Sequence, residues 1–343
     1  MPTARVVTLA HVAAAAGVNA STASKVLNGD AAVRVGPDTR ARILAAAKAL
    51  GYRPNALARG LRTARSHMLG IAVPQLENPV FPEIILGAET AARERGYSLL
   101  ISHSGEADGD ARLYEALAAV SRVDGLLVAT LEDEAVLASA LARSTVPFVV
   151  INRKLEGIAN HVVFDSFAAA RVATEHLLSL GHRRIAHLAG RTEGYNGTRR
   201  LAGYRAALEA AGLVFDPSLV VAAGYTVEGG EAAIRELLGR GAGFTGIVAA
   251  TVLTAAGAMK VLHATGLQLP SQMSIVGIHD AAIADMLHPP LTTVRLPLRE
   301  MGSVATHGLI DLLEGRIGQV ECTLPIERLV ARQSCAAPLG SRP

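Results

Sequence analysis

From Met68 onward, short apolar segments alternate with longer stretches of helical periodicity, a pattern typical of parallel sheets covered by helices. Nine segments fit buried strands: 69–73, 98–102, 125–129, 148–151, 161–164, 184–189, 220–223, 246–250 and 274–278. This number exceeds one comfortable domain, so the sequence predicts an α/β body with two parallel sheets. Residues 241–259 lack charged side chains, but four glycines and three threonines divide them between a strand and a helix. We therefore expect buried α/β core there rather than a membrane span.

The first 65 residues differ in charge from the rest of the chain. They hold ten Lys or Arg residues against two acids, Asp30 and Asp38, which gives a net charge of +8. The remaining residues include 23 basic and 28 acidic side chains, for a net charge of −5. A small basic module joined to a mildly acidic body predicts a polyanionic partner, with a merely solvated basic face as the alternative.

Three short helices are expected within this basic segment. Thr8 and Asn19 are good N-cap residues for the first two helices, and Gly17 supplies the turn between them. Asn28 ends the second helix, and Pro37 occupies the first position of the third. Two short helices joined by a tight turn and braced by a third form a helix-turn-helix, whose second helix fits the DNA major groove. An ordinary αα-hairpin is the alternative.

Two stretches of this segment can be compared with a known family. TLAHVAAAAGVNASTASKVLNG and TRARILAAAKALGYRPNALARGLRT resemble the headpiece of the lactose-repressor (LacI/GalR) family of bacterial transcription regulators, and later motifs extend the resemblance to about residue 334. The resemblance implies three parts: a helix-turn-helix headpiece at 1–53, a hinge helix and linker at 54–65, and an effector-binding and dimerisation domain at 66–343. That domain would have two lobes, like a periplasmic binding protein, with lobe crossings near 160, 290 and 325. His11 departs from the family, which usually has an acid there.

The resemblance also implies which headpiece and hinge residues meet DNA. These positions are Thr8, Asn19, Ala20, Ser21, Thr22, Lys25, Asn28, Tyr52, Asn55, Ala58 and Leu61. Ala20, Ser21 and Lys25 would face base edges, and Lys25 can donate to guanine or to a phosphate. Leu61 would enter the minor groove as an apolar wedge, or alternatively pack as an ordinary linker residue. Because the hinge helix is short and contains Gly60, we expect it to form only on DNA.

Effector-binding positions follow from the same resemblance. They are Phe81, Asn152, Arg153, Asp165, Asn196, Arg200, Thr251 and His279. Phe81 is the stacking candidate, Asn152 ends a strand as a polar contact, and Arg200 would grip the effector. Thr251 and His279 stand where the family often has acidic or amide residues, so a ligand rich in acceptors or negative charge would suit the arginines and His279. In the alternative, Arg153 points to solvent, His279 merely ends a strand, and the ligand is a neutral sugar.

No enzyme pattern stands out. The eleven histidines show no HExxH or comparable metal spacing, and no Walker loop or GxGxxG follows a strand, so we expect neither catalysis nor a cofactor. The chain has two cysteines, Cys322 and Cys335, and no apolar signal sequence. We therefore expect a cytoplasmic protein that does not associate with a membrane.

These features together predict a ligand-responsive repressor that acts as a homodimer on palindromic double-stranded operator DNA. A sugar or sugar-derived metabolite in the cleft between the lobes would be its effector. The rival class is a pure solute-binding protein, which the body alone would suit and against which the basic headpiece argues.

Overall fold

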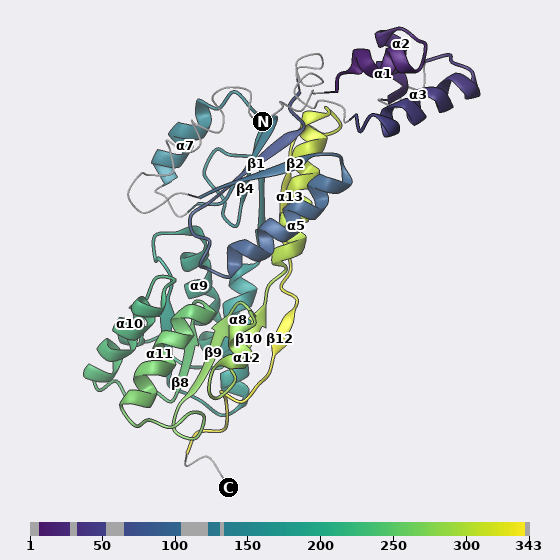
Figure 1. Ribbon diagram of the computed structural model, residues 1–343. Coiled ribbons are helices and arrows are strands. Elements are labelled where there is room, and N and C mark those ends of the chain that lie inside the picture. Colours follow the sequence, from purple (N-terminus) through teal and green to yellow (C-terminus); the bar gives the residue numbers. More distant parts are fainter. Residues whose placement is uncertain (1–6, 28–32, 53–64, 104–122, 131–133, 340–343) are drawn as a thin grey trace. The chain divides into compact units, whose positions relative to one another are not determined.

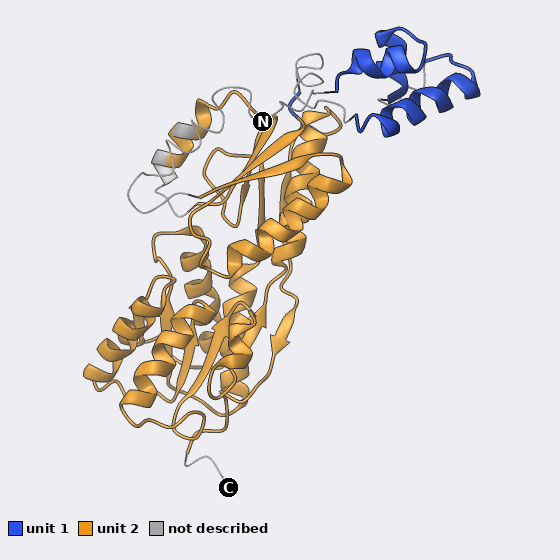
Figure 2. Cartoon of the chain, viewed as in Figure 1, with its two compact units in different colours: residues 1–66 blue, residues 67–343 orange. Residues whose placement is uncertain are grey.

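The computed structural model describes residues 7–27, 33–52, 65–103, 123–130 and 134–339. The chain forms two compact units, residues 1–66 and 67–343, shown in blue and orange in Figure 2. Within the described residues, no helix is both long enough and apolar enough to cross a membrane.

The described residues of the first unit hold three helices, α1 (Leu9–Ala15), α2 (Ala20–Leu27) and α3 (Pro37–Ala49). They enclose a small apolar core built largely from alanine, valine and isoleucine side chains. As predicted, Asn19 caps α2, because its Oδ1 accepts a hydrogen bond of 2.7 Å from the backbone N–H of Thr22. At the start of α1, Nδ1 of His11 accepts a bond of 3.2 Å from the Thr8 N–H. His11 therefore fills the acceptor position that an acidic residue takes in a capping box.

The second unit has two lobes. The first lobe is built on a six-stranded sheet in the order β11-β5-β4-β3-β1-β2, parallel at every described pairing. The strands are β1 (Met68–Val73), β2 (Ser98–His103), β3 (Gly125–Val128), β4 (Phe148–Ile151), β5 (His161–Phe164) and β11 (Glu321–Leu324). Its helices among the described residues are α5 (Val80–Glu94), α7 (Glu134–Ala142) and α13 (Leu298–Leu313). Figure 1 shows α5 and α13 together on one face of this sheet and α7 on the other.

The second lobe has another six-stranded sheet, in the order β12-β10-β9-β8-β6-β7. Among its described strands, only the β10–β12 pairing is antiparallel. The strands are β6 (Ile185–Ala189), β7 (Val220–Ala222), β8 (Gly246–Ala249), β9 (Ser274–Ile278), β10 (Thr292–Arg295) and β12 (Arg328–Val330). Its helices are α8 (Ser166–Ser179), α9 (Tyr195–Ala210), α10 (Val227–Gly239), α11 (Val252–Ala264) and the short α12 (Ile283–Met286), with a 3-10 turn at Pro217–Leu219. The two-sheet α/β prediction is confirmed, and all nine predicted strands are present to within one residue at each end.

The chain passes between the two sheets three times. It leaves the first sheet after Phe164, returns to α13 after Arg295, and passes again between Leu324 and Arg328. The resemblance placed these passages near 160, 290 and 325. One apolar cluster runs from α5 and α13 beside the first sheet to α8 and α9 beside the second, so the two lobes share core side chains.

Helices α5 and α13 pack at backbone contact through two glycines. A Cβ atom on Gly87 would lie 2.0 Å from the carbonyl oxygen of Arg299, and one on Gly302 would lie 2.1 Å from that of Ile84. Neither neighbour is a flexible side chain that can turn aside, so any larger residue must push the helices apart. The middle of α5 therefore packs directly against the backbone of α13.

Gly302→Ala should lower the free energy of unfolding by about 1–3 kcal/mol, because the added methyl group overpacks this contact. Urea unfolding of the full chain, followed by circular dichroism, measures the change. Gly318→Ala is the matched control, because a Cβ atom there has no atom within 4 Å. An equal stability for the two variants would show that the helices separate at no cost.

Candidate functional site

A cavity of about 130 Å³ opens between the two lobes of the second unit, at the carboxyl ends of several strands. Its walls come from both lobes: Asn78, Val80, Phe81, Thr130, Asn152 and Arg153 from the first, and Arg191, Glu193, Gly194, Tyr195, Asn196, Arg200, Tyr225 and Thr251 from the second, with Phe164 at a crossing. Ligands of open parallel sheets bind outside the carboxyl ends of strands, which makes this cavity the candidate effector site.

Arg200, in α9, is the most buried charged side chain of the cavity, at 4% exposure. Its Nη1 donates to the Ala250 carbonyl at 2.7 Å, and its guanidinium lies 5.7 Å from the ring centre of Phe164 and 6.0 Å from that of Tyr225. Burial lowers the pKa of Arg200, and the nearby Tyr225 acts in the opposite direction. Its Nε–H finds no acceptor among the described residues, so the side chain is held in place with a buried donor to spare.

Asn152 and Asn196 link the two lobes across the cavity. The Nδ2 of Asn196 donates to the backbone carbonyl of Asn152 at 2.6 Å and to its Oδ1 at 3.2 Å, while Oδ1 of Asn196 accepts from Ser166 at 2.6 Å. Asn152 directly follows β4 and has a φ of 67°, in the left-handed region that asparagine tolerates better than most residues. This turn directs the chain from the end of β4 toward the cavity.

The remaining predicted effector positions fall into two groups. Phe81, in the first turn of α5, and Arg153 line the cavity, as does Thr251, whose hydroxyl caps α11 by accepting from the Thr254 N–H at 3.1 Å. Asp165 does not line the cavity. Its carboxylate caps α8 by accepting from the Ala168 N–H at 3.0 Å.

His279 lines a second pocket, of about 470 Å³, together with Pro79, Glu83 and Arg299. It is 2% exposed, has a φ of 79°, and neither ring nitrogen has a hydrogen-bond partner within the described part of the chain. Burial lowers the pKa of His279 to about 4, assisted by the positive charge of Arg200. The imidazole is therefore neutral at pH 7.

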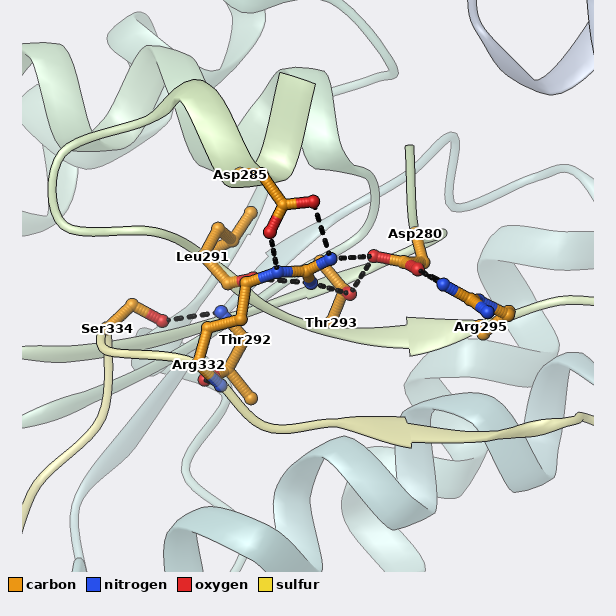
Figure 3. A network of polar contacts seen from close by, with 8 residues as sticks. All are labelled: Asp280, Asp285, Leu291, Thr292, Thr293, Arg295, Arg332 and Ser334. Atoms are coloured by element: carbon orange, nitrogen blue, oxygen red, sulfur yellow. Dashed lines mark hydrogen bonds and ion pairs between the residues drawn. The ribbon is translucent and has the colours of Figure 1, made fainter. Parts of the chain in front are cut away.

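The residue after His279 is held by a network of ion pairs, which Figure 3 shows. Oδ1 of Asp280 accepts from Thr293 at 2.7 Å and pairs with Arg332 at 2.8 Å, and its Oδ2 accepts from Nε of Arg295 at 2.8 Å. Arg332 also pairs with Asp285 at 2.6 Å. Burial would raise the pKa of Asp280, but the hydrogen bonds from Thr293, Arg295 and Arg332 outweigh it and lower the pKa. The network joins the loop after β9 to the C-terminal segment.

Several lining residues were not predicted from the sequence. Arg191 and Tyr225 follow β6 and β7, and Thr130 follows β3, so their places at strand ends were the available signal. Tyr195 begins α9, and burial raises the pKa of its hydroxyl. Gly190 is needed beside them, because a Cβ there would lie 2.4 Å from the Tyr225 ring.

Most of the predicted DNA-contacting residues that the structure describes are exposed on the first unit. Asn19, Ala20, Ser21 and Lys25 are exposed at the cap and outer side of α2, Thr22 is half-buried, Thr8 is exposed, and Tyr52 is half-buried. Asn28, Asn55, Ala58 and Leu61, with the hinge segment, lie outside the described residues. No group of three or more His, Cys, Asp or Glu residues in the described ranges is placed to hold a metal ion.

Two family profiles match the chain. "Bacterial regulatory proteins, lacI family" matches residues 8–55, and "Periplasmic binding protein-like domain" matches residues 174–335. The HTH-type transcriptional regulator CelR of Thermobifida fusca is 37% identical over 331 residues, covering 94% of this chain and 95% of that protein. The ribose operon repressor of Escherichia coli K12 is 34% identical over 325 residues, covering 94% and 96%. These relatives are transcriptional regulators rather than enzymes.

Solved structures agree with the sequence matches. The CelR–cellobiose complex has a TM-score of 0.74 at 34% identity and covers 96% of this chain and 99% of its own. The Lac repressor dimer bound to operator and the anti-inducer ONPF has a TM-score of 0.84 at 28% identity, covering 97% and 100%. The similarity therefore includes both the headpiece and the two-lobed body.

Proposed function

Because the chain belongs to the LacI family of bacterial regulatory proteins, we propose that it is a repressor that binds operator DNA as a homodimer under the control of a small molecule. The observation that carries this proposal is the basic helix-turn-helix, which presents one exposed side of α2, joined to a body with a cavity between two lobes. A sugar or sugar-derived metabolite in that cavity is the effector.

The headpiece supplies DNA affinity and base selection. Its net charge of +8 favours the phosphate backbone, and the exposed Ala20, Ser21 and Lys25 on α2 suit contact with base edges. Two headpieces in successive major grooves call for a roughly palindromic site. The Lac repressor structure, of a dimer on its operator, supports this arrangement. Leu61, outside the described residues, is proposed as the minor-groove wedge at the dyad.

The effector acts by preferring one arrangement of the lobes. The cavity is lined from both lobes, and the Asn152–Asn196 bond crosses it, so a ligand there contacts elements that move when the lobes rotate. A tenfold change in DNA affinity needs about 1.4 kcal/mol of coupling between the two sites. CelR, solved with cellobiose, shows a ligand-bound relative of the same architecture.

The test is the salt dependence of DNA binding by the full chain. If the protein neutralises DNA phosphates, the logarithm of its DNA affinity should fall linearly as the logarithm of the salt concentration rises. A DNA affinity that does not change with salt would contradict the repressor function and favour a solute-binding protein. Failure to select any bound duplex from a random pool would have the same meaning.

Lys25→Ala should change base preference at one position in each half-site of the selected operator, costing about 1–3 kcal/mol there if Lys25 donates to guanine. Binding titrations against single-base operator variants measure this. Lys48→Ala removes the same charge from the exposed side of α3 and should leave base preference unchanged. Equal losses by Lys25→Ala on all sequences would instead assign Lys25 to a phosphate.

A further inference from the structure

The side chains that line the cavity between the lobes include more cations than carboxylates. Arg153, Arg191 and Arg200 line it from three different elements, while Glu193, an exposed residue, is the only carboxylate among its lining residues in the described chain. Arg200 forms no ion pair with any described residue, although a buried charge without a counter-charge is costly. Arg200 is therefore a buried cation at the cavity wall without a carboxylate partner among the described residues.

Three side-chain oxygens of the cavity already accept hydrogen bonds within the protein. Oδ1 of Asn78 accepts from the Val80 N–H at 3.2 Å, and Oδ1 of Asn152 accepts from Asn196 at 3.2 Å. The Thr251 hydroxyl caps its own helix. A neutral sugar offers hydroxyl groups that donate as well as accept, whereas carboxylate and phosphate oxygens in their ionised forms only accept. These three oxygens are therefore less available to a ligand that must donate.

Two sets of donors remain. The Nε–H of the 96%-buried Arg200 has no acceptor within the described residues. The N-terminus of the sixteen-residue helix α9 lies at the cavity wall, where Gly194, Tyr195 and Asn196 line it and no side chain caps the helix. A guanidinium and uncapped backbone N–H groups at a helix N-terminus together form a setting that suits an oxyanion.

We propose that the effector is a small anionic sugar derivative, whose carboxylate or phosphate group binds Arg200 and the N-terminus of α9. This inference rests on the proposed function and narrows the ligand class within it. The cavity volume of about 130 Å³ is below the roughly 300–1,000 Å³ of most ligand pockets, which favours a ligand of monosaccharide size. Arg153 and Arg191 add positive charge at the same wall.

The experiment is calorimetric titration of the full chain with matched series. Each series contains a neutral sugar, its uronic or aldonic acid and its phosphate ester, for glucose, galactose and ribose, with inorganic phosphate alone as a further probe. We expect at least one anionic member to bind at least tenfold more tightly than its parent sugar, with affinity that falls as salt rises. Preference for the acid or for the ester identifies which oxyanion the site takes.

Variants then locate the anion. Arg200→Gln should reduce the preference for the anionic member at least tenfold, whereas Arg205→Gln, on the exposed side of the same helix, should leave it unchanged. Circular dichroism and DNA titration of each variant show that it is folded. A preference that survives Arg200→Gln in a folded protein would overturn the assignment to Arg200.

The outcomes also separate this inference from the proposed function. Neutral sugars that bind as tightly as their acids and esters would overturn the anionic ligand, and so would binding by no member of any series. In either case, retained salt-dependent operator binding would leave the repressor function standing. Loss of DNA binding by the unmodified chain, whatever its ligand preference, would instead reject the repressor function.

Discussion

Replacing Arg332 by alanine should lower the free energy of unfolding by about 3 kcal/mol, because it breaks a largely buried ion-pair network. The Arg332 side chain is 11% exposed and pairs with Asp280, whose side chain is 5% exposed, and with Asp285. It also donates to the Leu291 carbonyl at 3.0 Å. Without it, the carboxylate of Asp280 stays buried with Arg295 as its remaining cationic partner in the described network.

Urea unfolding of the full chain measures this loss, with Arg328→Ala as the matched control. Arg328 lies in β12, four residues before Arg332, and is exposed, so its removal should change stability by no more than about 0.5 kcal/mol. The double variant Asp280→Ala/Arg332→Ala should lose less than the sum of the single losses, because each partner's removal already breaks the pair. Equal stabilities for Arg332→Ala and Arg328→Ala would contradict a stabilising role for the network.

The ion-pair network explains how the loop with the strained backbone at His279 stays in place. His279 has a positive φ and is buried without a hydrogen-bond partner in the described residues, and Asp280 follows it directly. By tying Asp280 to β10 and to the C-terminal segment, the network fixes the loop that carries His279. Arg332 of the same network also holds the segment after β12 against β10.

Sequence patterns predicted the central strands well and the crossing strands poorly. Strands such as Gly246–Ala249 are buried on both faces, so they consist of continuous apolar residues that stand out between helices. By contrast, Thr292–Arg295, Glu321–Leu324 and Arg328–Val330 contain polar or charged residues. Their pairing is set by how the chain passes between lobes, which no local pattern encodes.

The residues of the candidate site, like the strands, were predicted from the sequence only in part. Phe81, Asn152, Arg153, Asn196, Arg200 and Thr251 line one cavity, while Asp165 caps a helix and His279 lines a different pocket. Sequence position places a residue at a strand end, but it does not say which side chain is used as a cap. The network of Asp280, Asp285 and Arg332 was not predicted, because its members meet only after the third crossing.

Lowering the pH from 7 to 4 should destabilise the second unit by about 3 kcal/mol for each of two buried histidines. Burial lowers the pKa of His187 and of His279 to about 4, from 6.5, and Arg200 contributes to both shifts. As the pH falls below 6.5, the unfolded chain therefore binds protons that the folded protein excludes. Stability is lost through the window from 6.5 to 4 and does not fall further from this cause below it.

Urea unfolding at a series of pH values tests this result on the full chain and on His187→Gln and His279→Gln. His187 is fully buried, stacks on Tyr204 at 5.0 Å and bonds to the Val248 carbonyl at 2.9 Å, so its variant will be less stable at every pH. The informative quantity is therefore the slope of the free energy of unfolding against pH. Each variant should reduce this slope, because the replaced histidine no longer takes up a proton on unfolding. His263→Gln, at an exposed position in α11, should leave that slope unchanged, and a slope equally steep in all three variants would assign the acid sensitivity to other groups.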